Sequence, residues 1–270
     1  MDPLPATPFT VSRDLPPYRA ILAVDAKGFT DEPGSTHQAI SGLIPQLVGV
    51  AFTRSGLAEV WETPSFFGPT GDGFAVGLPT EVLPSLVHPF LNELQRTLAR
   101  HNRDARHAEA RIRLRVSLHV GPLPVDPVNP HLGGNGTPRN DTHRLLDSKP
   151  VRAILAAASA EVTFVAAVLS DRVFHDVVVA GYTGRHPDHF VEVSATVPGK
   201  QFAQRAWLYV PELSGNLVTL APPHAPDTVS TDRDPASATA PAAGPRVRTN
   251  HGQVATVVHG GMQQRNRGQR

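Results

Sequence analysis

The chain has 270 residues, a formal net charge of +1, 27 prolines and no cysteine. Without cysteine it can form neither a disulfide framework nor a thiolate metal site, and a charge near zero gives no general attraction to nucleic acid. No run of about 18 apolar residues is present. The first 17 residues contain five prolines and no apolar run, so the sequence predicts a cytoplasmic protein without signal peptide or membrane span.

Strand and helix patterns alternate after a polar lead of residues 1–16, which we expect to be flexible. In chain order they predict a strand at 18–25, a helix from 35 to about 48, strands at 61–68 and 74–78, a helix at 84–106, a strand at 111–120, helices at 138–147 and 150–158, a strand at 162–169, a helix at 170–179, and a closing antiparallel pair at 190–197 and 204–210. Residues 17–213 are therefore predicted to form one α+β domain, with helices over a mixed, mostly antiparallel sheet.

Two details of this pattern carry their own expectations. Pro45 falls inside the first helical pattern and predicts a kink or a break there, because proline cannot donate the helical hydrogen bond. Arg111, Arg113 and Arg115 alternate with apolar residues, which predicts a strand whose arginine side faces solvent.

The composition changes near residue 214. Residues 214–250 are rich in Ala, Pro, Asp, Ser and Thr, which predicts a disordered linker. Residues 251–270 form a short basic tail that contains an uncharged, β-prone stretch from Gln253 to Met262. That stretch has the signature of a steric zipper and looks like the terminal amyloid-type motifs with which some bacterial defence proteins recruit partners. The alternatives are a tail whose apolar stretch has no role, and a basic tail that touches anionic lipid or nucleic acid.

Two aspartates lie where an apolar strand pattern meets a glycine-rich turn. Asp25 belongs to Ala-Val-Asp-Ala-Lys-Gly-Phe-Thr, and Asp72 lies between two glycines. Mg²⁺ is usually held by one or two carboxylates together with substrate phosphates, so two such acids on neighbouring strands could clamp two ions across a phosphoryl group. Either aspartate alone is also an ordinary turn residue.

Four segments in order carry a family resemblance. Residues 25–30 read Asp-x-x-Gly-Phe-Thr, Asp72 follows a glycine, residues 115–121 read Arg-x-Ser-x-His-x-Gly, and Asn140 precedes Arg144 by four positions. Together they resemble class III nucleotidyl cyclases, the adenylate and guanylate cyclase catalytic domains, over residues 17–211. The chain resembles a divergent bacterial member, with Ser117 where the family pattern has a glycine. The resemblance implies a ferredoxin-like, palm-type fold.

The resemblance also implies a reaction and a set of site residues. The chain would convert a nucleoside triphosphate into a 3′,5′-cyclic nucleotide and pyrophosphate for intracellular signalling, with two Mg²⁺ or Mn²⁺ ions per site. Asn140 would orient the ribose, Arg144 would stabilise charge on the α-phosphate, and Lys200 would reach the triphosphate. In this family the aspartates of one subunit meet the Asn/Arg pair of another, so a homodimer is implied. The metal would be held by Asp25, the carbonyl of Ala26, and Asp72, and the substrate would contact Gly28, Phe29 and Thr30.

The usual base-selecting residues are missing. Residues 64–68 offer no lysine and residues 131–134 no acid, where adenylate cyclases have them. Either base selection by that pair is absent, or the base is contacted by the backbone and by Phe66 and Phe67. The sequence does not select among ATP, GTP and pyrimidine nucleotides. The alternative function is a catalytically inactive, cyclase-like nucleotide sensor or adaptor that assembles with a protein partner through its C-terminal motif.

Overall fold

The computed structural model describes residues 10–28, 34–105, 111–124, 126, 129, 133–214, 254–258 and 261–265. It divides into two compact units, Met1–Pro223 and His224–Arg270, which are described separately. The elements of the first unit are β1 (Tyr18–Ala26), α1 (Gly34–Arg54), α2 (Ala58–Glu62), β2 (Phe66–Pro69), β3 (Gly73–Leu78), η2 (Thr80–Val82), α3 (Leu83–Ser85), η3 (Leu86–Phe90), α4 (Leu91–Asp104), β4 (Leu114–Pro122), α5 (Thr137–Leu146), α6 (Lys149–Ala157), β5 (Val165–Ser170), α7 (Asp171–Val173), η5 (Phe174–Val179), η6 (Pro187–His189), β6 (Val191–Thr196) and β7 (Ala203–Tyr209).

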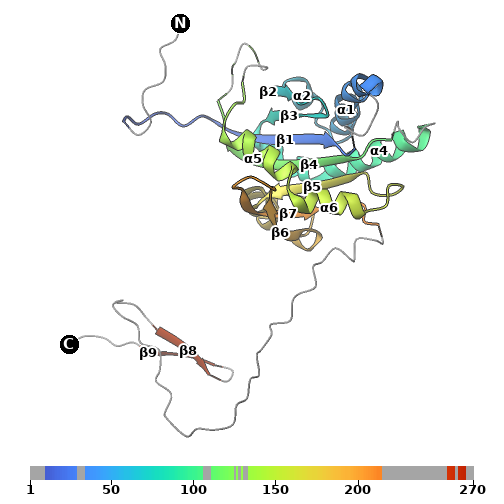
Figure 1. Cartoon of the computed structure of the whole chain (residues 1–270). Coiled ribbons are helices and arrows are strands. Elements are labelled where there is room, and N and C mark those ends of the chain that lie inside the picture. Colours follow the sequence, from blue (N-terminus) through green and yellow to red (C-terminus); the bar gives the residue numbers. More distant parts are fainter. Residues whose placement is uncertain are drawn as a thin grey trace. The chain divides into compact units, whose positions relative to one another are not determined.

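A seven-stranded sheet of order β2-β3-β1-β4-β5-β7-β6 forms the centre of the larger unit (Figure 1). The first four strands, with α1 and α4 in the connections, pair antiparallel in the order of a ferredoxin-like β-α-β-β-α-β unit. β5 then lies parallel to β4, and β7 and β6 close the sheet as antiparallel partners. The predicted α+β class, with a mixed and mostly antiparallel sheet, is confirmed.

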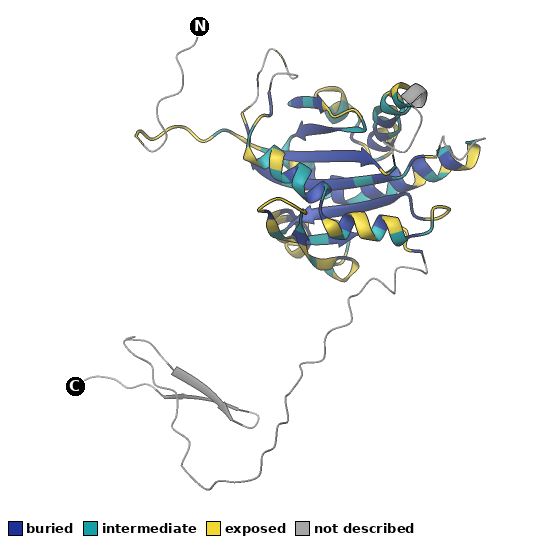
Figure 2. Cartoon of the chain, viewed as in Figure 1, coloured by how far each residue is buried: buried dark blue, intermediate teal, exposed yellow. Residues whose placement is uncertain are grey.

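Helices cover both faces of this sheet. Alternate residues of β1 point in opposite directions, because successive side chains of a strand leave it on opposite faces. Leu22 and Val24 join the large core formed with α1 and α4, whereas Ile21 and Ala23 pack on the face that α5 covers. α6 packs next to α5 on that same face, against β5 and β7. Figure 2 shows the result, with buried strands and helices that are exposed only on their outer sides.

Three expectations about single elements are wrong. The break predicted at Pro45 is absent, since α1 runs from Gly34 to Arg54 through it. Trp61 lies in the short helix α2 rather than in a strand. Arg115 does not face solvent, because α5 covers that side of β4 and only 12% of the side chain is exposed, whereas Arg111, which precedes the strand, is exposed as predicted.

The second unit contains a hairpin of β8 (Val254–Val258) and β9 (Gly261–Arg265). The predicted β-prone stretch overlaps this hairpin. Residues 1–9 of the predicted lead and residues 215–250 of the predicted linker lie outside the described part of the chain. Of the helices described, none has both the length and the apolar character needed to cross a membrane.

Candidate functional site

The two predicted acids come together at one end of β1. Asp25 is the next-to-last residue of that strand, and it faces Gly73 of β3 and Arg115 of β4 as direct cross-strand partners. The N–H of Ala26 donates to the carbonyl oxygen of Asp72 at 2.9 Å, which ties the β2–β3 turn to the strand end. Gly73 is needed for this approach, since a Cβ there would lie 1.9 Å from the carbonyl oxygen of Val24.

Arg115 forms a bidentate ion pair with Asp25. Its Nε donates to Oδ1 at 2.7 Å and its Nη2 donates to Oδ2 at 2.6 Å. Both side chains are largely buried, with 12% and 8% exposed. Two of the three arginines of residues 111–115 thus make inward contacts, while Arg111 forms a surface ion pair with Glu161. Arg113 also donates inward, to the carbonyl oxygens of Thr163 at 2.9 Å and Ala158 at 3.1 Å.

The charges around Asp25 oppose one another. The pKa of Asp25 is raised to about 7, mainly because the carboxyl group is buried; the Arg115 guanidinium opposes this rise, and the nearby carboxylates of Asp72 and Asp147 add to it. A cation placed among these acids would stabilise the ionised carboxylate.

The donor set fits a divalent ion that is shared with phosphate. No group of three or more His, Asp or Glu side chains converges to hold a metal among the described residues. Asp25 and Asp72 together offer two carboxylates, and the neighbouring carbonyl of Ala26 adds a further hard oxygen donor. Mg²⁺ sites that include substrate phosphates commonly use one or two carboxylates. The residues therefore fit Mg²⁺ or Mn²⁺ brought together with a phosphorylated ligand.

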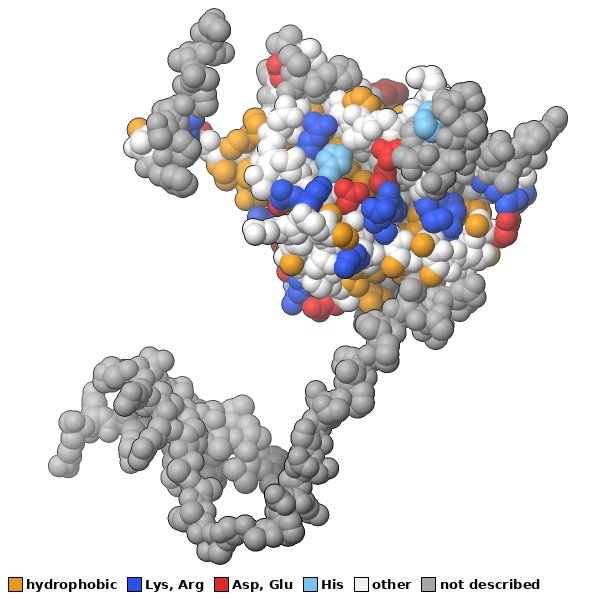
Figure 3. All heavy atoms as spheres, in the orientation of Figure 1, with side chains coloured by type: hydrophobic (Ala, Val, Ile, Leu, Met, Phe, Trp, Pro, Cys, Tyr) orange, Lys and Arg blue, Asp and Glu red, His pale blue; other side chains and the backbone are white. Residues whose placement is uncertain are grey.

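Asn140 and Arg144 lie on one side of α5, four residues apart. The helix buries Thr142, Leu145 and Leu146, leaving Asn140 exposed and Arg144 partly exposed. The Arg144 guanidinium donates to Asp141 at 2.9 Å and lies 5.7 Å from the centre of the Phe202 ring. Within the described part of a single chain, no hydrogen bond or ion pair joins Asn140 or Arg144 to the two acids. Figure 3 shows basic, acidic and histidine side chains gathered on the face that carries α5.

Lys200 is exposed in the turn between β6 and β7, next to Gly199, whose φ of 74° suits glycine. It is close enough to α5 to affect His143. Burial lowers the pKa of His143, Arg139 and Lys200 lower it further, and Asp147 and Asp72 oppose them. Lys200 and Asp72 thus both lie near enough to His143 to affect its pKa, in opposite directions. His143 was not among the predicted residues; its position three residues after Asn140 on the helix was the available signal.

Phe66 and Phe67 leave β2 on opposite faces and so cannot both line one pocket. Phe66 is fully buried, with the Arg139 guanidinium 5.3 Å from its ring centre. Phe67 instead stacks on Phe74 at 4.9 Å, on the side of α1 and α4. The prediction that both rings contact the base does not match this arrangement. Sequence reasoning missed Arg139, which is the cation next to Phe66.

The predicted phosphate turn after β1 is described only in part. Gly28 has a φ of 81°, a left-handed conformation that favours glycine and keeps side-chain bulk away from the strand end. Phe29 and Thr30 lie outside the described residues.

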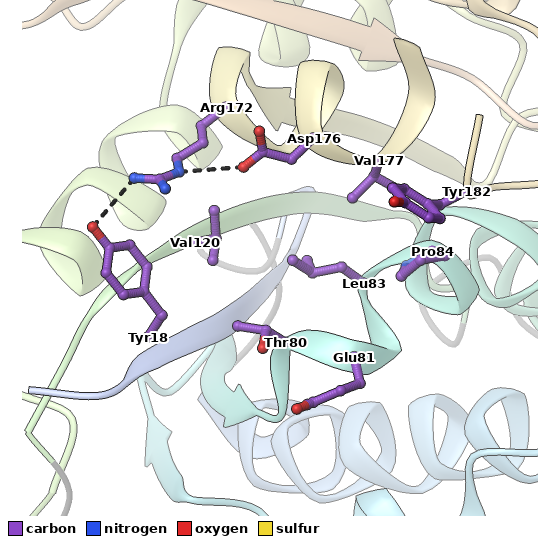
Figure 4. A pocket seen from close by; sticks show the side chains of 10 residues that line it. All are labelled: Tyr18, Thr80, Glu81, Leu83, Pro84, Val120, Arg172, Asp176, Val177 and Tyr182. Carbon is purple, nitrogen blue, oxygen red and sulfur yellow. Dashed lines mark hydrogen bonds and ion pairs between the residues drawn. The ribbon is translucent and has the colours of Figure 1, made fainter. Parts of the chain in front are cut away.

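A pocket of about 440 Å³ lies at the other end of β1 (Figure 4). There Arg172 donates to the hydroxyl of Tyr18 and to Asp176, both at 3.3 Å. Tyr18 begins β1, and seven residues at about 3.3 Å each place it roughly 23 Å from Asp25. This pocket is therefore separate from the paired acids. It is lined by Tyr18, Thr80, Glu81, Leu83, Pro84, Val120, Arg172, Asp176, Val177 and Tyr182.

No protein-family model and no curated protein matches the chain. Among solved structures it is similar to a bacterial light-regulated adenylyl cyclase, with 12% identity and a TM-score of 0.49; the match covers 77% of this chain but only 56% of that protein. It is similar to the guanylate cyclase domain of RhGC from Catenaria anguillulae in complex with GTP, with 16% identity, a TM-score of 0.43, and 72% and 96% of the two chains covered. For the adenylate cyclases of Trypanosoma brucei in their monomeric state, the identity is 12%, the TM-score 0.46, and the coverage 80% and 95%. These proteins are adenylyl and guanylyl cyclases, the family that the sequence motifs resemble.

Proposed function

We propose that the chain is a nucleoside-triphosphate cyclase that releases a 3′,5′-cyclic nucleotide and pyrophosphate. The observation that supports this most is the pairing of Asp25 and Asp72 at the end of β1. There the backbone bond from Ala26 to Asp72 holds the two acid-bearing segments together at 2.9 Å. In the reaction, the ribose 3′-oxygen bonds to the α-phosphorus, the bond from that phosphorus to the leaving pyrophosphate breaks, and the hydroxyl proton is released.

Four of the predicted residues, Asp25, Asp72, Asn140 and Arg144, have roles that follow from their chemistry. Asp25 and Asp72 bind the metal and orient the triphosphate. Two divalent ions, Mg²⁺ or Mn²⁺, would neutralise the triphosphate and make the 3′-hydroxyl a better nucleophile. Arg144 stabilises charge on the α-phosphate with its planar, permanently charged guanidinium, and Asn140 orients the ribose. Positioning and charge neutralisation supply most of the rate in such transfers.

The site is proposed to be shared between two copies of the chain. Asn140 is exposed on α5, and in a single chain neither it nor Arg144 is bonded to the acids among the described residues. A second copy would bring its Asn140 and Arg144 to Asp25 and Asp72 of the first. A homodimer would then contain two such composite sites, because two-fold interfaces repeat every contact.

A nucleotide screen tests this function. The purified full chain is incubated with Mn²⁺ or Mg²⁺ and each of ATP, GTP, CTP and UTP, and cyclic mononucleotide is measured by mass spectrometry. We expect product from at least one nucleotide. Asp25→Asn and Arg144→Ala should each lower kcat by roughly 100-fold or more, since each removes a charge that acts on the transferring phosphoryl group. Arg152→Ala, at an exposed arginine of α6, is the matched control and should leave kcat unchanged.

Two results would contradict these assignments. Absence of product from all four nucleotides, in a sample shown to be dimeric, removes the enzyme function. Full activity in Asp25→Asn or Arg144→Ala removes that residue from the site.

One observation favours a second function, a nucleotide sensor or adaptor without turnover. In the free chain both carboxylate oxygens of Asp25 are taken by Arg115. The sequence also lacks the base-selecting lysine and acid, which favours the same sensor or adaptor function. Calorimetry that detects binding of a nucleotide, together with no cyclic product from that nucleotide, would select this alternative.

A further inference from the structure

Arg115 binds both oxygens of the carboxylate that would hold a metal at Asp25. Its two N–H groups reach both oxygens, at 2.7 and 2.6 Å, in the parallel arrangement that makes an arginine–carboxylate pair strong. The pair has little access to water, with 12% and 8% of the two side chains exposed. A metal ion therefore meets a carboxylate that already has a cationic partner.

The sheet fixes this pair rather than a loop. Asp25 and Arg115 are direct partners in the antiparallel register of β1 and β4, and side chains of such partners project from the same face. Ser117, the next residue of β4 on that face, is fully buried and donates to the carbonyl oxygen of Thr142 on α5 at 2.8 Å. The guanidinium is thus confined between the sheet and the helix that covers it, with Asp25 as its acidic partner.

We propose that Arg115 is a built-in counter-ion that competes with the divalent metal for Asp25, so that metal binds tightly only together with the nucleotide. The inference rests on the proposed function, in which Asp25 is a metal ligand. Without metal, the guanidinium neutralises a buried carboxylate, and such a charge without a partner is costly. A metal ion alone must use the remaining lone pairs of these oxygens or displace an N–H···O bond, and in either case it adds positive charge beside the guanidinium.

A triphosphate removes that penalty. Its negative charge can pair with Arg115 as the guanidinium is released, because arginine binds phosphate with the same planar fork that binds carboxylate. Metal and nucleotide binding are then coupled, and by linkage each strengthens the other to the same extent. Toward the metal, Arg115 is thus a positioning residue that acts through Asp25.

Binding of Mn²⁺ alone tests the competition. Mn²⁺ is titrated into the full chain without nucleotide, and free Mn²⁺ is followed by electron paramagnetic resonance. We expect Arg115→Met to bind Mn²⁺ roughly 10-fold or more tightly than the wild-type chain, a size typical of changes next to a metal ligand. The matched control is Arg113→Met, which removes a half-buried arginine two residues away that contacts carbonyl groups rather than Asp25; it should leave the affinity unchanged.

Further variants guard against a folding defect. Arg115→Met leaves Asp25 without its partner, so Arg115→Lys is measured as well. The lysine ammonium keeps the positive charge but cannot form two parallel hydrogen bonds. The Mn²⁺ affinity of Arg115→Lys should therefore lie between those of the wild-type chain and Arg115→Met. Asp25→Asn should abolish the binding. Mn²⁺ affinity in both Arg115 variants that equals or falls below the wild-type value overturns the competition while leaving the proposed function intact. No Asp25-dependent binding in any of the proteins, with nucleotide or without, overturns the metal assignment and this inference together.

Discussion

At the scale of single residues, the α5-covered side of β4 carries polar groups in a buried setting. Arg115, Ser117 and His119 alternate along the strand on that side, while Leu114, Val116 and Leu118 enter the main core. Arg115 and Ser117 have partners, but Nδ1 of His119 is buried without a hydrogen-bond partner. A buried polar atom left unpaired costs stability, and the cost grows if the group must take up a charge.

The pH dependence of stability should reflect His119. Burial lowers its pKa below 6.5, whereas the unfolded chain binds the proton with a pKa of about 6.5. Below that pH the unfolded state holds more protons at this histidine than the folded state, so the contribution of His119 to the free energy of unfolding should be full above about pH 6.5 and fall as the pH drops. His119→Leu should reduce this fall by up to about 1.4 kcal/mol per pH unit, measured by urea unfolding at pH 7.5 and 5.5.

His88 and His143 contribute in the same direction, because burial lowers the pKa of each, so part of the acid sensitivity should remain in the variant. His189→Gln, at an exposed histidine, serves as the control and should leave the pH dependence as it is. An unchanged pH dependence in His119→Leu would show that this histidine does not charge on unfolding.

The sequence predicted the acids but not their partners. Asp25 and Asp72 could be found because each ends an apolar strand next to glycine, which is a local pattern. Arg115 could not, since a period of two shows only that arginines share one side of a strand, and whether a helix covers that side depends on a distant segment. The opposite directions of Phe66 and Phe67 follow from the same period of two and were available from the sequence.

At the scale of elements, three glycines shape the surroundings of β2. A Cβ on Gly77 or Gly134 would lie 2.3 Å from a carbon of the Phe66 ring, and a Cβ on Gly68 would lie 2.0 Å from the Arg139 guanidinium. These glycines let the loop before α5 and the start of that helix pack directly on β2. The position of α5 over the sheet therefore depends on small residues in segments that are far apart in the chain.

Gly134→Ala should be more destabilising than Gly181→Ala. Both glycines have a φ of 78°, so an alanine at either position pays the cost of a left-handed backbone, about 1–2 kcal/mol. Only at position 134 does the new Cβ meet the Phe66 ring, because nothing lies within 4 Å at position 181. We expect an extra cost of about 1–3 kcal/mol for overpacking, measured by urea unfolding. Equal losses of stability at the two positions would show that the loop at Gly134 moves enough to accommodate the added methyl group without overpacking.

Pro45 is a second element-scale case. α1 continues through it, although proline provides no N–H for the carbonyl of Ser41. Pro45→Ala should raise the free energy of unfolding by about 1–3 kcal/mol in thermal or urea unfolding, because it restores that bond and removes the ring from the helix interior. The exposed Gln46→Ala is the control, with an expected change below about 0.5 kcal/mol. A loss of stability in Pro45→Ala would show that the proline ring packs favourably.

Helix and strand boundaries were predictable to different degrees. β1, α5 and α6 lie close to their predicted ranges because each has strong periodicity and clear end signals. α2 was taken for a strand, since five residues are too few to display a helical period. The unbroken α1 shows that packing of Ile44, Val48 and Phe52 into the main core outweighs the local effect of proline.

At the scale of the whole molecule, the proposed composite site predicts complementation. Asp25→Asn and Arg144→Ala chains should each be inactive alone, yet an equimolar mixture should regain about a quarter of wild-type activity. Random pairing makes half of the dimers mixed, and each mixed dimer contains one intact site of two. Cyclic nucleotide formation after mixing and equilibration measures this. A mixture as inactive as its components would show that both residues act within one chain.

The parallel pairing of β4 with β5 also bears on how the chain folds. β2 and β3 are joined by a short turn, whereas β4 and β5 are separated by the whole segment from residue 123 to 164. Contacts over such separations form slowly, because the entropy of closing the intervening loop is lost before any contact compensates it. Asp25 and Arg115 both precede α5 in the chain, so during biosynthesis they can meet as an exposed couple and lose contact with water only when α5 docks.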